Sequence, residues 1–219
     1  MVDTVIFDVD GTLVDTNYQH ALAWFRALRR HGITKPVWQL HRGIGMGGDQ
    51  FVPKIVGQKV EDELGDELRE AWAQEFGRMI GEIQPLEGAH ELLAEVKERG
   101  FTLVLASSGQ AEQVEHFLDL VDGKRLADAW TTSEDAEKSK PEPDLIETAM
   151  AKVDGKDAIM IGDSTWDAIA AGKAGIPTIA VRTGGFSTEE LLQAGASSVW
   201  DSLVQLRTHL DDVGLGMEK

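Results

Sequence analysis

The stretch VIFDVDGTLVDT, residues 5–16, constrains the fold of this chain more than any other segment. Its apolar start, residues 5–7, is typical of a buried strand and runs directly into Asp8, Asp10 and Gly11. Aspartate is a poor strand residue, and burying an unpaired charge is costly, so a partner is expected. Alone, the pattern also fits a strand followed by an Asp-Gly turn, in which Asp8 caps a loop.

Further short apolar runs predict more strands of the same kind. They are rich in valine and isoleucine and lack a polar alternation, as in parallel strands that are covered on both faces. Helical patterns lie between them from about residue 85 onward, so we expect a doubly wound parallel α/β sheet. The runs are residues 102–106, 158–161 and 178–181, a weaker one at 198–200, and 129–132.

The segment between the first strand and residue 84 contains only helical patterns. We therefore expect a Rossmann-like core from residues 1–15 and 84–219, with a helical cap from residues 16–83 inserted into it. Its three tryptophans, Trp24, Trp38 and Trp72, are expected in the core of the cap. Two apolar helix faces are predicted, one with Ala21, Leu22, Phe25 and Leu28, the other with Leu64, Leu68, Trp72, Phe76, Met79 and Ile80.

Composition excludes several classes of function. The 219 residues carry a net charge of -17, which repels phosphate backbones, so no nucleic-acid partner is expected. The absence of cysteine excludes disulfides, thiolate metal sites and a cysteine nucleophile. No apolar stretch approaches the roughly 18 residues of a membrane span, and no signal-like segment starts the chain. A cytoplasmic protein without a membrane partner is expected.

The predicted strands end in residues that carry chemistry. The run 102–106 leads into Ser107, Ser108 and Gly109, and the run 158–161 leads into Gly162 and Asp163, with Asp167 shortly after; Lys140 stands before a proline. Ligands in open α/β sheets bind at the carboxyl ends of the strands. Carboxylates suit Mg²⁺, and serines, backbone N–H groups and lysine suit phosphate oxygens. The sequence thus predicts a site for a divalent cation and a phosphate.

Four motifs in this order, DVDGT, LASSG, SKPEPD and IGDSTWD, resemble those of the haloacid dehalogenase superfamily, in the branch with a helical cap after the first motif. The resemblance implies that Asp8 is the nucleophile and forms an aspartyl phosphate, while Asp10 is the general acid and base. It implies that Ser107 and Lys140 hold the phosphoryl group. The implied Mg²⁺ ligands are Asp8, the main-chain carbonyl of Asp10, Asp163 and Asp167; the expected substrate contacts are Gly11, Thr12, Ser108, Gly109 and Arg42.

These residue types suit the implied roles. A carboxylate such as Asp8 is ionised at neutral pH and needs no base to become a nucleophile. The cation and Lys140 would remove its repulsion from an anionic phosphate. Asp10 has to carry a proton, so its pKa is expected to lie above that of Asp8.

The function expected from the resemblance is Mg²⁺-dependent hydrolysis of a small phosphorylated metabolite, such as phosphoglycolate or a sugar phosphate, by a monomer or homodimer. Two alternatives remain: a sugar-phosphate mutase and a non-catalytic regulator that keeps the fold. Thr16 and His20 resemble residues of the β-phosphoglucomutase branch. Gly48 and Gln110, however, stand where that branch carries two cations for a second phosphate, so a phosphatase is expected.

Three glycines, Gly43, Gly45 and Gly48, satisfy the dinucleotide pattern G-x-G-x-x-G. No strand precedes them, so the pattern fails in its context. Two alternatives remain for this loop, a cap loop that reaches over the site and an ordinary turn between helices. The sequence leaves open whether His20 and His41 belong to the site or to the surface.

Overall fold

The computed structural model describes residues 2–216 and contains a six-stranded, fully parallel sheet in the order β3-β2-β1-β4-β5-β6. Every predicted strand is present, and the doubly wound α/β fold is confirmed. The weak run at 198–200 is the end of the edge strand β6, which begins at Ala196. The strands are β1 (Thr4–Asp8), β2 (Thr102–Ala106), β3 (Ala129–Thr131), β4 (Ala158–Gly162), β5 (Thr178–Val181) and β6 (Ala196–Trp200).

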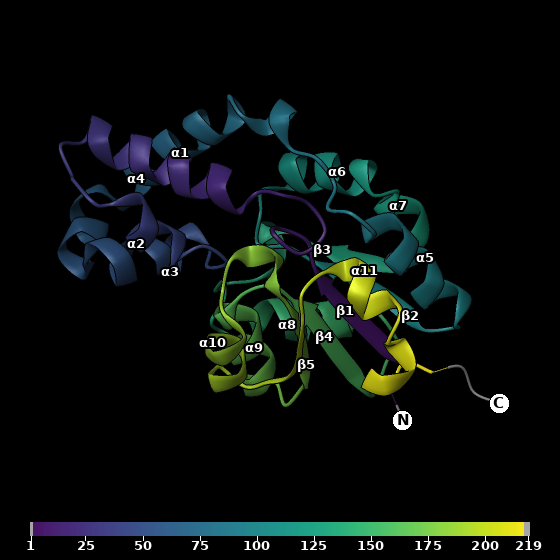
Figure 1. The fold of residues 1–219 in the computed structure, drawn as a ribbon. Coiled ribbons are helices and arrows are strands. Elements are labelled where there is room, and N and C mark those ends of the chain that lie inside the picture. The colour runs from purple at the N-terminus through teal and green to yellow at the C-terminus, as the bar shows by residue number, and fades with distance from the viewer. Residues whose placement is uncertain (1, 217–219) are drawn as a thin grey trace.

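Helices cover both faces of the sheet, because successive strand residues point to opposite sides. Val5 and Phe7 pack toward one set of helices, and Ile6 packs toward the other. Figure 1 shows α5, α7 and α11 on one face and α8 and α9 on the other. The core helices are α5 (Ala89–Glu98), α6 (Ala111–Leu120), α7 (Gly123–Leu126), α8 (Asp144–Ala151), α9 (Thr165–Lys173), α10 (Thr188–Gln193) and α11 (Leu203–Arg207), with short 3-10 turns η3 (Ser133–Asp135), η4 (Arg182–Gly184) and η5 (Leu210–Val213).

The segment between β1 and α5 contains helices, turns and loops but no strand in the structure. It packs around a hydrophobic cluster that includes Trp24, Phe51 and Leu68 and is separate from the clusters on the sheet. We call residues 16–83 the cap. That they form a separate domain with these boundaries stays a prediction. The cap contains α1 (Asn17–Arg30), α2 (Val37–His41), α3 (Gly48–Phe51), a π-helical turn η1 (Val52–Val56), α4 (Gln58–Gly77) and a 3-10 turn η2 (Ile80–Glu82).

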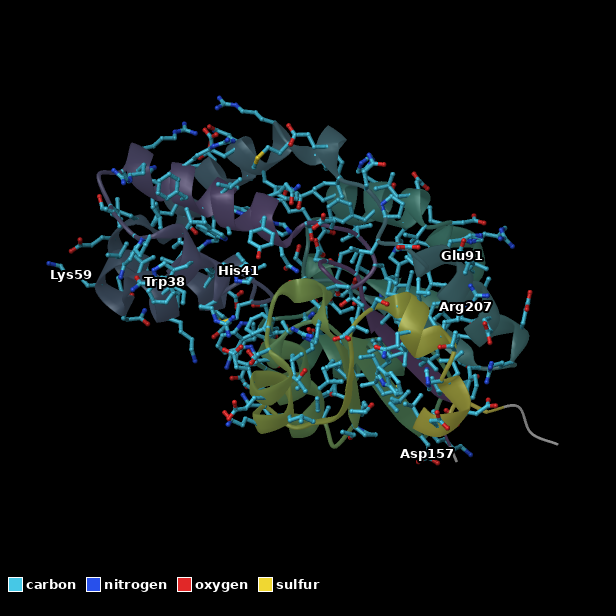
Figure 2. All side chains as sticks on the ribbon, viewed as in Figure 1. Trp38, His41, Lys59, Glu91, Asp157 and Arg207 are labelled. Atoms are coloured by element: carbon cyan, nitrogen blue, oxygen red, sulfur yellow. The ribbon has the colours of Figure 1, made fainter. Side chains whose placement is uncertain are left out.

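The cap lies over the end of the sheet that is far from the N-terminus (Figure 1). Asp157, immediately before β4, lies at the opposite end of the sheet, whereas His41 lies on the side of the cap nearer the core (Figure 2). Since Asp157 precedes its strand, the cap covers the carboxyl ends of the strands.

Two predictions about the cap were wrong in part. Trp38 is 65% exposed instead of buried, and Leu22 is 37% exposed. The buried side of α1 instead contains Ala23, Trp24 and Ala27, because this helix packs against both α2 and α4. Small alanines allow that close approach on two sides.

Candidate active site

Three carboxylates meet at the carboxyl ends of neighbouring strands. Asp8 ends β1, Asp163 follows β4, and Asp167 lies in the first turn of α9. Each is buried, and each offers one oxygen within 4.8 Å of the other two. Strand order explains the meeting, because β1 pairs directly with β4.

Lys140 inserts one positive charge among these acids. Its side chain is 2% exposed and comes from the loop between β3 and α8. The ammonium pairs with Asp8 Oδ1 and, at 2.6 Å, with Asp167 Oδ1. Burial opposes its charge, but Asp167 and Asp8 outweigh that cost and raise the pKa of Lys140. The lysine is therefore charged, and three carboxylates face one ammonium.

The remaining excess of negative charge fits a divalent cation. Burial, together with Asp167 and Asp163, raises the pKa of Asp8 although Lys140 lowers it. Burial and Asp167 raise the pKa of Asp163 to about 7. A bound cation would relieve this crowding, and carboxylate oxygens are the ligands that Mg²⁺ prefers. The residues present therefore fit the metal that the sequence predicts.

The loop after β1 holds Asp163 in place. The Thr12 hydroxyl lies 2.9 Å from Asp163 Oδ1 and 3.0 Å from Asp8 Oδ2, and the Asn17 amide donates to Asp163 Oδ2 at 2.9 Å. A Cβ on Gly11 would lie 2.5 Å from Asp163 Oδ2, and one on Gly184 would lie 2.0 Å from the same atom. Gly11 also has a φ of +82°, so both the lack of space and the backbone conformation require glycine there.

Asp10 lies beside this cluster with its own partners. Ser107 Oγ donates to Asp10 Oδ2 at 2.7 Å, and His20 Nε2 lies 3.1 Å from Oδ1. Burial acts to raise the pKa of Asp10, but the contacts with His20 and Ser107 lower it overall. For the protein groups alone, these two shifts run opposite to the expected order of pKa values, because crowded acids surround Asp8 and hydrogen-bond partners surround Asp10. The expected order in the presence of a cation stays a prediction.

A cavity of about 570 Å³ separates the cap from the core. We call its floor the sheet end; Asp8, Asp10, Ser108, Gly109 and Lys140 line it. The opposite wall, the cap end, includes Trp24, Trp72, Arg69 and residues 44–48 of the glycine loop. The loop thus reaches over the site instead of forming a remote turn.

Several predicted site residues do not line this cavity. They include Gly11, Thr12, Asp163 and Asp167; the Thr12 hydroxyl contacts Asp163 and Asp8, and Gly11 leaves room for the Asp163 carboxylate. Ser107 contacts Asp10 and accepts a hydrogen bond from the Gly109 N–H at 3.0 Å. Their roles toward substrate stay predictions.

Arg42 is placed differently from the expectation of a substrate contact. Its guanidinium pairs with Glu190 and lies 4.1 Å from the ring centroid of Phe186, both in the core. Its carbonyl accepts a hydrogen bond from Trp166 Nε1 at 3.2 Å. Arg42 therefore connects the cap to the core, and it is not one of the residues that line the cavity.

Sequence reasoning missed the place of four residues in the site. Asn17 and Ser139 are ordinary polar residues; Ser139 Oγ accepts from Gly47 N at 2.9 Å and donates to Asp49, which ties the cap to the loop of Lys140. Trp72 stacks on His20, with ring centroids 5.5 Å apart. Arg69 lies against Gly48, where no cation was expected.

Comparison with known proteins identifies the family. The model of the haloacid dehalogenase-like hydrolases matches residues 5–181, so the chain belongs to this family. A hydrolase of Pseudomonas syringae has a TM-score of 0.90 and 32% identity, over 96% of this chain and 98% of that one.

Two curated relatives have more specific names. A phosphoglycolate phosphatase of Vibrio vulnificus is 28% identical over 94% of both chains. A putative pyrophosphatase, PpaX, of Caldanaerobacter subterraneus is 26% identical over 83% of this chain and 82% of its own. Among the residues that the structure describes, no helix combines the length and the apolar character needed to cross a membrane.

Proposed function

We propose that the chain is a Mg²⁺-dependent phosphatase that hydrolyses a small phosphorylated metabolite through a phosphorylated Asp8. The observation that carries the proposal is the floor of the cavity, where Asp8, Asp10 and Lys140 lie beside two further buried carboxylates. The relatives named as a phosphoglycolate phosphatase and a pyrophosphatase act on phosphorylated compounds, which supports the same reaction class.

Asp8 is the proposed nucleophile. One of its oxygens forms a bond to phosphorus while the bond between phosphorus and the leaving oxygen breaks. Lys140 pairs with Asp8 and orients its carboxylate, and the same ammonium neutralises phosphoryl charge. Asp8, Asp163 and the Asp10 carbonyl, with Asp167 in support, would hold Mg²⁺, which would supply further charge neutralisation.

Asp10 is proposed to move the proton in both halves of the reaction. It gives a proton to the leaving oxygen, and then takes one from the water whose oxygen displaces Asp8 from phosphorus. His20 and Ser107 hold its carboxylate and favour the ionised form, which suits the second half. An arriving phosphate dianion would raise the pKa of Asp10 by like-charge repulsion and so favour the protonated form for the first half.

The test is phosphate release from a panel of phosphorylated metabolites and from an aryl phosphate, with Mg²⁺ and with excess chelator. Hydrolysis that needs Mg²⁺, together with a phosphorylated protein that hydroxylamine cleaves, is expected. Transfer of phosphate between two positions of a sugar faster than its release would instead favour the mutase. No turnover of any compound would favour the non-catalytic regulator.

A further inference from the structure

Each end of the cavity has a single lysine or arginine side chain. Among the residues that line the cavity, only Lys140 and Arg69 are lysine or arginine, and Lys140 belongs to the floor. Arg69 is therefore the one such cation available to recognise whatever part of the substrate points away from the phosphate.

Two carboxylates on its own helix, α4, already neutralise the positive charge of Arg69. One terminal nitrogen lies 2.9 Å from both oxygens of Glu61 and 3.3 Å from the carbonyl of Gly48, and the other lies 2.8 Å from Asp66. The hydrogen bonds that Arg69 donates to Glu61 and Asp66 raise its pKa against the cost of burial. A second anionic group of a substrate would have to compete with two carboxylates for this guanidinium.

The rest of the wall adds negative charge. Asp49 and Glu70 from the cap and Glu137 from the core line the cavity, and all three are exposed. We call them the acidic rim. With Glu61 and Asp66 they set five carboxylates against one guanidinium, and charges of one sign in a cleft repel a ligand of that sign.

Part of the cavity wall is apolar. Trp24, Ile44, Met46 and Leu145 line the cavity and are buried, and Trp72 lies beside them. Trp24 and Trp72 stack with ring centroids 5.6 Å apart, so they present a fixed aromatic surface. Such a surface suits the C–H face of a ring, and rim carboxylates can accept hydrogen bonds from hydroxyl groups.

The geometry points to a substrate with a single anionic group: the monophosphate of an uncharged, polyhydroxylated compound such as a sugar or cyclitol. The volume of about 570 Å³ agrees, because it leaves most of the cavity for the part beyond the phosphate. Phosphoglycolate and pyrophosphate, named for two relatives, carry a second anionic group and are expected to be poor substrates. This inference rests on the proposed phosphatase activity and narrows its substrate class.

A matched pair of compounds tests the inference. Glucitol 6-phosphate and 6-phosphogluconate differ only in whether the far end of the chain is a hydroxymethyl group or a carboxylate. With Mg²⁺ present, kcat/KM for the uncharged member is expected to exceed that for the anionic member by about tenfold or more. Equal values, or a preference for the carboxylate, would overturn the inference.

Binding separates this inference from the proposed reaction. Calorimetry of the Asp8→Asn protein with each compound is expected to give tighter binding of glucitol 6-phosphate even if neither compound is hydrolysed. In that case the substrate class stands and the phosphatase proposal fails. Equal binding, or no binding of either, would overturn the substrate class whatever the activity.

Charge reversal in the acidic rim gives a second test. Glu70→Lys should raise kcat/KM for 6-phosphogluconate relative to glucitol 6-phosphate by about threefold to tenfold, because it adds a cation beside Arg69. Glu63→Lys is the matched control, since Glu63 lies on the same helix, is exposed and does not line the cavity. A ratio that moves equally in both variants would show that the rim does not select the substrate.

Discussion

The two ends of the cavity are built by different physical rules. At the sheet end, charged groups are buried, paired with one another and held by backbone that leaves no room for a Cβ. At the cap end, aromatic side chains form the surface and the carboxylates are exposed. Burial makes charge interactions strong and geometry strict, whereas exposed charges are screened. Substitutions at the sheet end are therefore expected to disrupt the reaction. Substitutions at the cap end are expected to change which substrate binds at low cost in stability.

The largest effect that this comparison predicts is at Asp8, the proposed nucleophile. Asp8→Asn keeps the shape of the side chain but removes the attacking carboxylate, so kcat should fall about 10⁴-fold or more. Phosphate release measures it. Asp15→Asn, the same change at a nearby exposed position, should leave the rate within about twofold. Comparable activity in the two variants would contradict the assignment of Asp8.

Metal binding should depend on the sheet end alone. Asp163→Asn removes one of three crowded carboxylates, so Mg²⁺ affinity should fall by at least about 10–100-fold, as for lost groups that support a metal site. Calorimetric titration measures this directly. Mg²⁺ should also raise the melting temperature of the wild-type protein, since it binds only the folded state, and the variant should lose most of that rise. An unchanged affinity would place the metal elsewhere.

The strict geometry of the floor predicts a stability effect at Gly184. An alanine there would place Cβ 2.0 Å from Asp163 Oδ2 and 2.7 Å from the Asp163 carbonyl, so Gly184→Ala should cost about 1–3 kcal/mol of unfolding free energy. Gly172→Ala is the control, because Gly172 lies in α9 with no atom within 4 Å of its added Cβ. That variant should be stabilised by about 0.5–1 kcal/mol. Denaturant unfolding compares the two, and equal effects would show that the floor tolerates displacement.

The same contrast explains how much could be predicted from sequence. The strands and the residues at their ends were predicted correctly, because apolar runs that end in acids and hydroxyls are local patterns. Contacts between distant residues were not predictable in this way: Asn17 and Asp163 are separated by 146 positions, and Ser139 and Asp49 by 90. The relative pKa of Asp8 and Asp10 also depends on such neighbours, so local patterns could not predict it.

The cap was harder to predict because its helices bury side chains on more than one face. Trp38, expected in the core of the cap, is exposed, and Arg69 fills the space beside Gly48 from another helix. A missing cation at one sequence position therefore says little about the charge at that point in space. Here the neutralising acids on α4, and not the glycine, decide the electrostatics of the cap end.

The smallest expected effect distinguishes the two readings of Arg42. If Arg42 bound the phosphate, Arg42→Gln would remove a charge-assisted hydrogen bond worth about 1.5–3 kcal/mol and raise KM about tenfold or more. The structure instead pairs it with Glu190 across the junction of cap and core, where a partly exposed ion pair contributes about 0–1 kcal/mol. We therefore expect KM to change by no more than about threefold. Glu190→Gln should have the same effect, and the double variant should add nothing, because both changes break one contact. A large rise in KM for Arg42→Gln alone would restore Arg42 as a substrate contact.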